Sequence, residues 1–340
     1  MTYTDLERFN DSLKGQPKDR VPVFAGFGLW AATNFPEAPF EQIASDPGLI
    51  VKALLWCREL IGVDGLYPSV DPLFIPEAFG CNVRFLETGP LVNPLPMSID
   101  SPEDIEKIDF PNPREGGRLP VVLEAARQLS DKTRGEVPLI GVFEGAFTQT
   151  CRVIELEHIL RMTYKKPQIL EVLLDRMNGF LIEFGLALIE NGVNLLFIPE
   201  PTASSAMIAP LMFRQYVLPR LKKLTSQMGV PVILHICGDT KPILGAMGET
   251  GAEILSLDQC MDLSESKATV PDKVLAGNVD PVKSLLLGDT KQVKKDALNC
   301  LQKAGTDRFI LMPGCGVPPN TPVENLKAMV EAAADYGVRG

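Results

Sequence analysis

The sequence lacks a long uncharged apolar run. Its most apolar long segment, residues 180–189, is interrupted by Glu183 and is too short to span a bilayer. Basic residues are also few, since 33 Lys and Arg face 43 Asp and Glu and leave a formal net charge of −10. A chain this acidic is a poor partner for nucleic acid or an anionic membrane surface. We therefore expect no membrane or nucleic-acid partner, and a small molecule or another protein instead.

The cysteines lack the pattern of a disulfide framework. Their number is odd, they are scattered along the chain, and no secretory signal precedes them. They are Cys57, Cys81, Cys151, Cys237, Cys260, Cys300 and Cys315. Free thiols persist in a reducing compartment, so this pattern predicts a cytoplasmic protein.

What the sequence does contain is enough apolar material for a large core. At 340 residues, 45% hydrophobic and 22% charged, it can form one barrel-sized domain, and no low-complexity linker divides it. We expect residues 1–340 to form a single domain.

Eight short apolar runs alternate with helix-like segments. Such runs are typical of parallel strands covered by helices, and eight of them predict an α/β fold of the (β/α)8 TIM-barrel type. The predicted strands are residues 21–27, 62–69, 137–143, 193–199, 231–236, 252–257, 273–276 and 308–312. A hairpin inserted between the second and third strands is expected from residues 83–86 and 91–93 around Thr88-Gly89-Pro90.

Two helices carry clear end signals. Asp46-Pro47 opens a helix over 48–61, and Gly62 follows where it should stop. Thr321-Pro322-Val323-Glu324 predicts a capping box, with Thr321 as N-cap and Glu324 in a structural role, before a helix that runs to about Tyr336.

Several predicted strands end in polar residues, and barrel enzymes build their active sites at the carboxyl ends of their strands. These candidates are Glu144, Glu200, His235, Cys237, Asp258, Asn278 and Cys315. We take Glu144, Glu200 and Asp258 as candidate catalytic carboxylates and Asn278 as a candidate cofactor-binding residue.

His235 and Cys237 are two positions apart at the end of one strand, so both side chains can point the same way. Cys315 follows the last strand and can supply a third ligand, giving the Cys2His set of catalytic zinc with one coordination position open. The spacing alone is also compatible with a hydrogen-bonded core histidine and inert buried thiols. The fold has to bring the two cysteines together.

The sequence resembles the uroporphyrinogen decarboxylase superfamily along nearly its whole length, and within it the methylcobamide:coenzyme M methyltransferase branch. The resemblance rests on residues 117–125, Phe143-Glu144-Gly145, Leu234-His235-Ile236-Cys237-Gly238, Ala276-Gly277-Asn278-Val279 and Pro313-Gly314-Cys315-Gly316 with residues 321–325. It implies a (β/α)8 barrel that holds Zn2+ through His235, Cys237 and Cys315. It further implies transfer of a methyl group from a methylcorrinoid, carried by a corrinoid protein, to a thiol bound on the metal.

The sequence departs from this family at two motifs. Glu144-Gly145-Ala146 stands for the usual Glu-Gly-Pro, and Glu200-Pro201 for Asp-Pro. Relatives also carry a carboxylate, usually Glu, that can occupy the fourth zinc position. Here that residue is Asp258, a metal-ligand candidate with which Cys260 competes.

Two other functions stay open from sequence alone. One is a metal-independent decarboxylase, which the resemblance would equip with an arginine-rich segment after the first strand; residues 25–33 contain no basic residue. The other is a non-catalytic corrinoid-binding barrel. The resemblance implies a thiol such as coenzyme M as the methyl acceptor, and another thiol or a folate stays open as an alternative.

Overall fold

The computed structural model describes residues 3–16, 18–26, 28–86 and 89–337. Six parallel strands follow one another in chain order through a single sheet, each paired with the next. They are β3 (Ile140–Val142), β4 (Leu195–Pro199), β5 (Val232–Ile236), β6 (Ile254–Leu257), β7 (Val274–Val279) and β8 (Phe309–Pro313). All six strands predicted after residue 130 are confirmed, and β7 continues past its predicted end at Ala276 because Asn278 and Val279 pair with Met312 and Pro313.

The ring closes through the two remaining predicted segments. Val23 makes a parallel bridge to Leu311 of β8, and Leu66 makes one to Leu139 beside β3. The Asp64 amide donates to the Val23 carbonyl at 2.9 Å and joins these two segments.

The prediction of regular strands over 21–27 and 62–69 is therefore wrong in detail, because each segment pairs through one isolated bridge. Pro22 and Pro68 have no amide hydrogen to donate to a ladder, which accounts for the interruption. Phe27, the last residue of the first prediction, lies outside the described residues.

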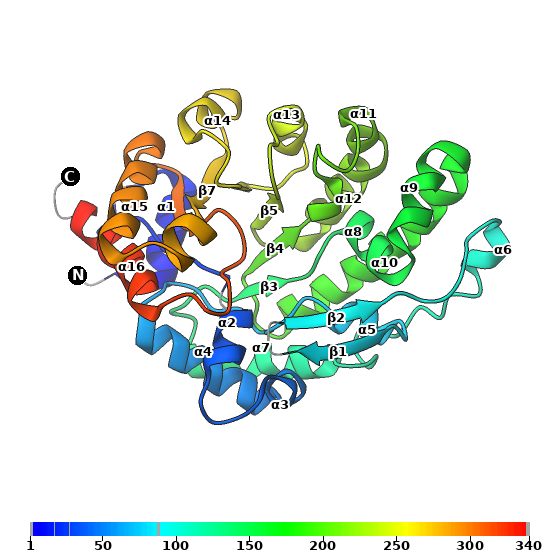
Figure 1. Cartoon of the computed structure of the whole chain (residues 1–340), viewed down its shortest axis with the longest axis horizontal. Helices are drawn as coiled ribbons and strands as arrows, with labels where there is room; N and C mark the ends of the chain where they lie inside the picture. The colour runs from blue at the N-terminus through cyan, green and yellow to red at the C-terminus, as the bar shows by residue number, and fades with distance from the viewer. Residues whose placement is uncertain (1–2, 17, 27, 87–88, 338–340) are drawn as a thin grey trace.

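Helices surround the sheet (Figure 1), and they cover the apolar outer faces of its strands. They are α1 (Asp5–Lys14), α2 (Gly28–Asn34), α3 (Phe40–Ser45), α4 (Pro47–Ile61), α5 (Phe74–Ala78), α6 (Pro102–Ile105), α7 (Leu119–Thr133), α8 (Ala146–Val153), α9 (Leu156–Lys165), α10 (Pro167–Glu190), α11 (Pro210–Met212), α12 (Leu218–Met228), α13 (Leu244–Gly248), α14 (Leu263–Thr269), α15 (Thr290–Ala304) and α16 (Val323–Gly337). Shorter turns η1 (Pro201–Ala203), η2 (Phe213–Val217) and η3 (Pro281–Leu286) complete the connections. Within the described ranges, none of these helices is long and apolar enough to cross a membrane.

The predicted end signals of α4 are confirmed. The Asp46 side chain accepts a hydrogen bond from the Leu49 amide, and Gly62 ends the helix with φ of +86°. The capping box at Thr321 is wrong. Helix α16 begins at Val323, and the buried Thr321 hydroxyl has no hydrogen-bond partner among the described residues. Thr321 instead uses its carbonyl, which accepts from Trp30 Nε1 at 2.9 Å.

The hairpin expected between the second and third barrel segments is present as β1 (Asn82–Leu86) and β2 (Gly89–Asn93), paired antiparallel. Thr88 of its predicted turn lies outside the described residues. Phe85 packs edge to face on Phe40, and the Arg118 guanidinium lies 5.0 Å over the Phe85 ring. These contacts fix the hairpin against the barrel.

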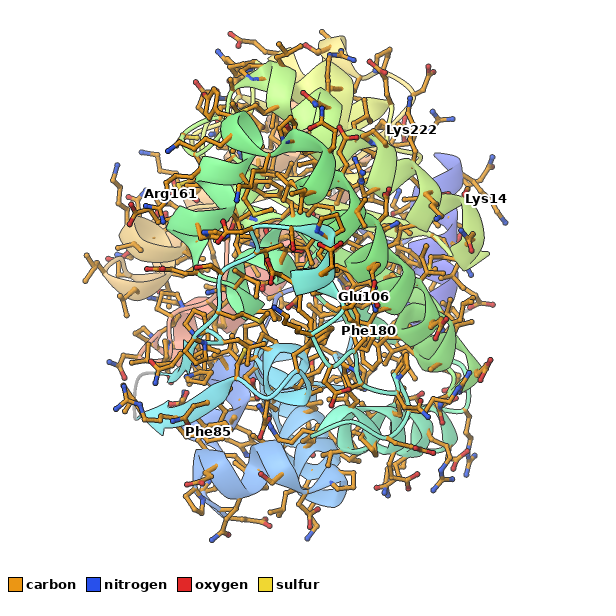
Figure 2. The ribbon with its side chains drawn as sticks, turned by 90° about the vertical axis from the view of Figure 1, so that its right-hand side faces the viewer. Lys14, Phe85, Glu106, Arg161, Phe180 and Lys222 are labelled. Carbon is orange, nitrogen blue, oxygen red and sulfur yellow. The ribbon has the colours of Figure 1, made fainter. Side chains whose placement is uncertain are left out.

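A second apolar cluster fills the barrel interior. It joins Phe9 of α1 and Phe24 and Tyr67 of the two bridging segments to inward residues of the sheet such as Ile310 and Met312. Charged side chains such as Lys14, Arg161 and Lys222 lie at the periphery (Figure 2). The interior is thus a packed core, which leaves the strand ends as the place for a site.

Candidate metal centre

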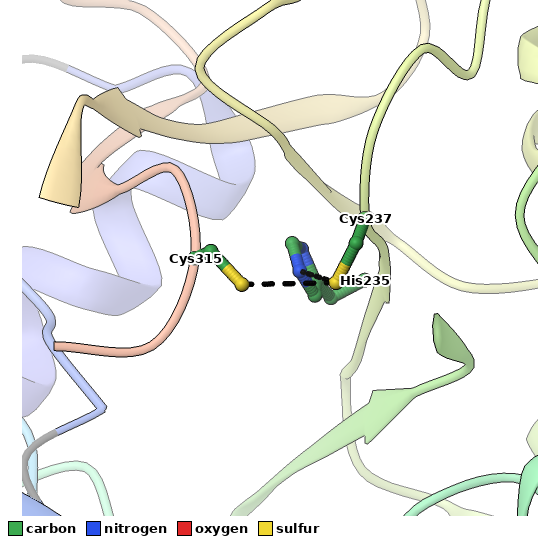
Figure 3. Close-up of side chains that lie close together, drawn as sticks. All are labelled: His235, Cys237 and Cys315. Carbon is green, nitrogen blue, oxygen red and sulfur yellow. Dashed lines mark hydrogen bonds between the residues drawn. The ribbon is translucent and has the colours of Figure 1, made fainter. Parts of the chain in front are cut away.

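Three ligand atoms converge at the carboxyl ends of β5 and β8. Cys237 Sγ lies 3.3 Å from His235 Nε2 and 3.7 Å from Cys315 Sγ (Figure 3). All three atoms lie within 4.8 Å of one another, and His235, Cys237 and Cys315 are the members of this group among the described residues. The predicted meeting of the two cysteines is therefore present. One nitrogen and two sulfurs at this spacing are a donor set that suits zinc.

Ser256 of β6 fixes the orientation of the His235 ring. His235 Nδ1 lies 3.2 Å from both the carbonyl oxygen and the hydroxyl of Ser256. A carbonyl only accepts, so Nδ1 carries the hydrogen and Nε2 keeps its lone pair for a ligand. The Phe197 ring of β4 stacks on the imidazole with centroids 6.0 Å apart and restricts its rotation further.

The two thiols lie in contact, and their interaction moves their pKa values in opposite directions. The Cys315 pKa is lowered to about 4, because its sulfur accepts from Cys237 and lies beside His235. The Cys237 pKa is raised, because Cys315 holds its proton, the thiol is half-buried, and the carboxylates of Asp258 and Glu144 lie near. Cysteine binds a divalent cation as the thiolate, so metal binding would release any thiol proton that remains.

Asp258, the predicted fourth ligand, lies beside the cluster but outside it. Its side chain is buried, and its two oxygens accept from the Gly238 amide at 2.8 Å and the Cys260 amide at 3.0 Å. Cys260 is exposed, and burial together with the charge of Asp258 raises its pKa to about 11. The identity of the fourth ligand stays a prediction.

Glu200 directly follows β4 and is buried. Its carboxylate accepts from the amides of Phe147 and Thr148 at 3.2 and 2.9 Å and from the Thr148 hydroxyl at 2.6 Å, so it caps the first turn of α8. Burial raises its pKa to about 7 despite these hydrogen bonds. Glu200 also donates its own amide to the His235 carbonyl at 2.8 Å, which ties the cap to the ligand strand.

Glu144 lies two residues after β3 and is paired with Arg152 of α8. Arg152 Nη2 and Nε donate to the two carboxylate oxygens at 2.9 and 3.1 Å. The Glu144 side chain is 5% exposed and that of Arg152 is 38% exposed. Only the cation therefore reaches solvent. Arg152 also lines a surface cavity of about 440 Å3 between β2, α8 and the loop after β4.

Asn278, the predicted cofactor-binding residue, uses its amide inside the protein. Nδ2 donates to the carbonyls of Asp258 and Met261 at 2.9 and 2.8 Å, and the Cys300 thiol donates to Oδ1. These contacts hold the loop after β6. A cofactor contact for Asn278 remains a prediction that the structure leaves untested.

Sequence reasoning missed Ser256, Thr148 and Arg152. Ser256 could have been found, because parallel pairing of consecutive strands puts the middle of β6 level with the end of β5. Arg152 and Thr148 lie on α8, whose bounds were not predicted, so no spacing rule pointed to them.

The chain matches the family model described as uroporphyrinogen decarboxylase (URO-D) over residues 4–336. It belongs to the uroporphyrinogen decarboxylase family. Among curated members, it is 30% identical to a methylcobamide:CoM methyltransferase of Methanosarcina barkeri over 98% of both chains. A methylcobamide:CoM methyltransferase of Methanosarcina mazei is 31% identical over 98% of both chains. A solved methyltransferase from Methanosarcina mazei shares 31% identity, covers 98% of this chain and 99% of its own, and superposes with a TM-score of 0.91. All three relatives are methyltransferases, and the solved one has the same fold, so the expected family and fold are confirmed.

Proposed function

We propose that this chain is a zinc-dependent methyltransferase that moves a methyl group from a methylated corrinoid protein to a small thiol. The observation that carries the proposal is the convergence of His235 Nε2 and the sulfurs of Cys237 and Cys315 at the strand ends. The names of the similar methyltransferases support the methyl donor. In this proposal a corrinoid protein is the partner that delivers the methyl group at the mouth of the barrel.

The residues of the site fit the ion. Two cysteine sulfurs and one neutral imidazole offset the charge of a divalent cation, and Ser256 already orients the imidazole. When bound, zinc would keep an acceptor thiol deprotonated at neutral pH. His235, Cys237 and Cys315 would hold the ion at the strand ends, above the apolar interior of the barrel.

The neighbouring carboxylates have positioning roles in this proposal. Glu200 connects the first turn of α8 to β5 through its side-chain and backbone hydrogen bonds. Asp258 holds the backbone immediately after Cys237 through the Gly238 amide. Both contacts limit movement of the ligand strand.

A metal-independent decarboxylase does not account for this geometry. Decarboxylation without a metal gives no reason for three soft ligand atoms to converge beside an oriented histidine. A non-catalytic barrel likewise gives no reason for a ligand set that leaves one coordination position open.

The test is an assay of zinc-loaded protein with methylcobalamin, or a methylated corrinoid protein, and a panel of thiols and a folate. We expect formation of cobalt(I) corrinoid and a thioether, while uroporphyrinogen is left unchanged. If no acceptor is methylated from free or protein-bound methylcorrinoid by fully loaded enzyme, the proposal is wrong.

The fourth ligand has its own test. If Asp258 fills that position at rest, X-ray absorption should detect two sulfurs, rising to three when the thiol acceptor binds. Three sulfurs at rest, reduced to two in Cys260→Ser, would assign the position to Cys260 instead.

A further inference from the structure

The two cysteines of the candidate metal centre lie on separate segments, 78 residues apart in the chain (Figure 3). Cys237 follows β5 and Cys315 follows β8, and the strands β6 and β7 lie between these two in the sheet. The distance of 3.7 Å between the two sulfurs therefore depends on what connects the two segments at the carboxyl end of the barrel.

One turn, residues 258–261 after β6, contacts the immediate neighbour of each cysteine. We call these four residues the β6 turn. On one side, the Asp258 carboxylate accepts from the Gly238 amide at 2.8 Å. On the other side, the Gln259 backbone packs so closely against Gly314 that a Cβ at position 314 would lie 2.4 Å from the Gln259 nitrogen. The β6 turn thus connects the two cysteine segments.

A buried side chain of β7 fixes the β6 turn in place. Asn278 is 9% exposed, and its Nδ2 donates to the carbonyls of Asp258 and Met261, the two ends of the turn, at 2.9 and 2.8 Å. The Met261 amide closes the turn by donating to the Asp258 carbonyl at 3.0 Å. The Cys300 thiol donates to Asn278 Oδ1 at 3.5 Å and holds the amide group in this orientation. Movement of the turn relative to β7 would break these hydrogen bonds.

The Cys315 segment is attached to the same strand. The Gly314 amide donates to the carbonyl of Val279 in β7 at 2.8 Å, and Gly314 is buried. A side chain at position 314 would meet backbone atoms of Gln259 rather than the end of a flexible side chain. It would therefore have to displace either the β6 turn or the segment that carries Cys315.

Building on the proposed function, we propose that the β6 turn, held by Asn278, sets the distance between Cys237 and Cys315 and so determines the affinity of the site for its metal ion. Ligands that are held in position before the ion arrives bind it more tightly, because less order has to be imposed on binding. Asn278 is thus a positioning residue that acts through the turn. This role is the same whether Asp258 or Cys260 completes the coordination.

The first test removes the support of the turn. The dissociation constant for zinc, measured by competition with a chromophoric chelator, should rise by about tenfold or more in Asn278→Ala. Asn325→Ala is the matched control, because Asn325 is also buried and its Nδ2 donates to the carbonyls of Leu285 and Gly288 at 2.9 and 2.8 Å. Each variant loses two hydrogen bonds to a loop, but Asn325→Ala should keep the wild-type affinity for zinc.

The second test inserts a methyl group between the turn and the Cys315 segment. Gly314→Ala should also weaken zinc binding by about tenfold or more, because its Cβ displaces the Gln259 backbone or the segment itself. Gly316→Ala, on the other side of Cys315, is the control, since a Cβ at position 316 has nothing within 4 Å. In protein loaded with cobalt(II), the thiolate-to-metal absorption should change in Gly314→Ala and stay as in the wild type in Gly316→Ala.

Wild-type affinity for zinc in Asn278→Ala or in Gly314→Ala would overturn this role of the turn, as would an equal loss in the matched controls. If zinc binds as expected but no thiol is methylated, the proposed methyl transfer fails while the role of the turn stands.

If the wild type binds no zinc, the proposed function fails, and phenylarsine oxide then decides the role of the turn in metal-free protein. This reagent bonds to two neighbouring thiols with loss of water. Its capture of Cys237 and Cys315 together should be slower in Asn278→Ala and Gly314→Ala than in the wild type and the two controls. Equal rates in all five proteins would overturn the role of the turn.

Discussion

Both ends of the barrel bury ionisable groups, but the two ends differ in whether the protein itself supplies the opposite charge. At the amino end, Asp64 is 1% exposed and accepts from Arg8 at 2.8 Å, from Arg20 at 2.6 and 2.7 Å, and from the Val23 amide at 2.7 Å. At the carboxyl end, the sulfurs of Cys237 and Cys315 and Nε2 of His235 face one another. The amino end contains its own counter-charges, whereas in the proposed function an added cation completes the ligand set at the carboxyl end. The ion-pair cluster around Asp64 therefore stabilises the fold, and the cluster of His235, Cys237 and Cys315 is suited to binding a metal ion.

We expect the largest effect from removing a ligand cysteine at the carboxyl end of the barrel. Cys237→Ala and Cys315→Ala each remove an anionic ligand, so zinc content should fall from about one per chain to near zero and methyl transfer should be lost. The fold should persist, because the large apolar core does not depend on the metal. Metal analysis and circular dichroism check both statements. Cys57→Ala is the control, since Cys57 lies in the core on α4. Normal zinc content in both ligand variants would contradict the site.

Removing the buried carboxylate at the amino end should have the opposite effect, which is a loss of stability without a loss of zinc. Asp64→Asn leaves Arg8 and Arg20 without their shared buried carboxylate, and should lower the free energy of unfolding by about 3–5 kcal/mol. Zinc content per folded molecule should stay unchanged. Urea denaturation measures the loss.

Asp131→Asn is the control for this variant, because Asp131 pairs with Arg127 at 2.9 Å and the two side chains are 68% and 52% exposed. An exposed pair contributes about 1 kcal/mol or less. Equal losses in the two variants would show that burial of Asp64 is not what matters.

Glu200, at the carboxyl end, should make the free energy of unfolding depend on pH. The Glu200 pKa is about 7 in the folded protein against an ordinary value of 4.5, because the carboxyl group is buried. Since the folded pKa is the higher one, the stabilisation is complete below about pH 4.5 and is lost as pH rises through about 7. At about 1.4 kcal/mol per pKa unit, the loss reaches roughly 3 kcal/mol.

Glu200→Gln mimics the neutral carboxyl and should remove this slope from the free energy of unfolding, measured between pH 5 and 8. Glu190→Gln is the control, because Glu190 forms an exposed pair with Arg114 and should keep the wild-type slope. A wild-type slope in Glu200→Gln would exclude Glu200 as its source.

The sequence predicted the ligand cluster for a physical reason. Alternation along β5 puts His235 and Cys237 on one side, and the carboxyl ends of parallel strands share one rim, so Cys315 had to come near them. The hydrogen-bond partners of the cluster could not be predicted without the register between neighbouring strands. The pairing of His235 with Ser256 follows only from that register.

Other features escaped prediction because tertiary contacts decided them. Pro22 and Pro68 reduce two expected strands to single bridges, although their apolar residues still pack inside the ring. Thr321 lost its capping role because its carbonyl is taken by Trp30 and its hydroxyl is buried one residue too far from the start of α16. Local sequence patterns predict the helices and strands, but the hydrogen-bond partners of polar groups depend on how the barrel assembles.

The smallest expected effect lies between the two ends, at Tyr67. Its ring packs in the interior cluster with Phe24 and Met312, and its hydroxyl is buried with no hydrogen-bond partner among the described residues. Burial accordingly raises the Tyr67 pKa. Because a buried hydroxyl without a partner costs about 1–3 kcal/mol, Tyr67→Phe should raise the free energy of unfolding by about 1 kcal/mol and leave zinc content unchanged.

Tyr216→Phe is the matched control for Tyr67→Phe. Tyr216 is equally buried, but its hydroxyl donates to the Thr163 carbonyl at 2.8 Å, so the same change should lower stability by about 1 kcal/mol. Thermal or urea denaturation of the two variants gives opposite signs if the barrel interior is dry. A loss of stability in Tyr67→Phe would mean that a bound water reaches the Tyr67 hydroxyl. The interior would then be connected to the site above it, and the two ends of the barrel would no longer be separated by a purely apolar core.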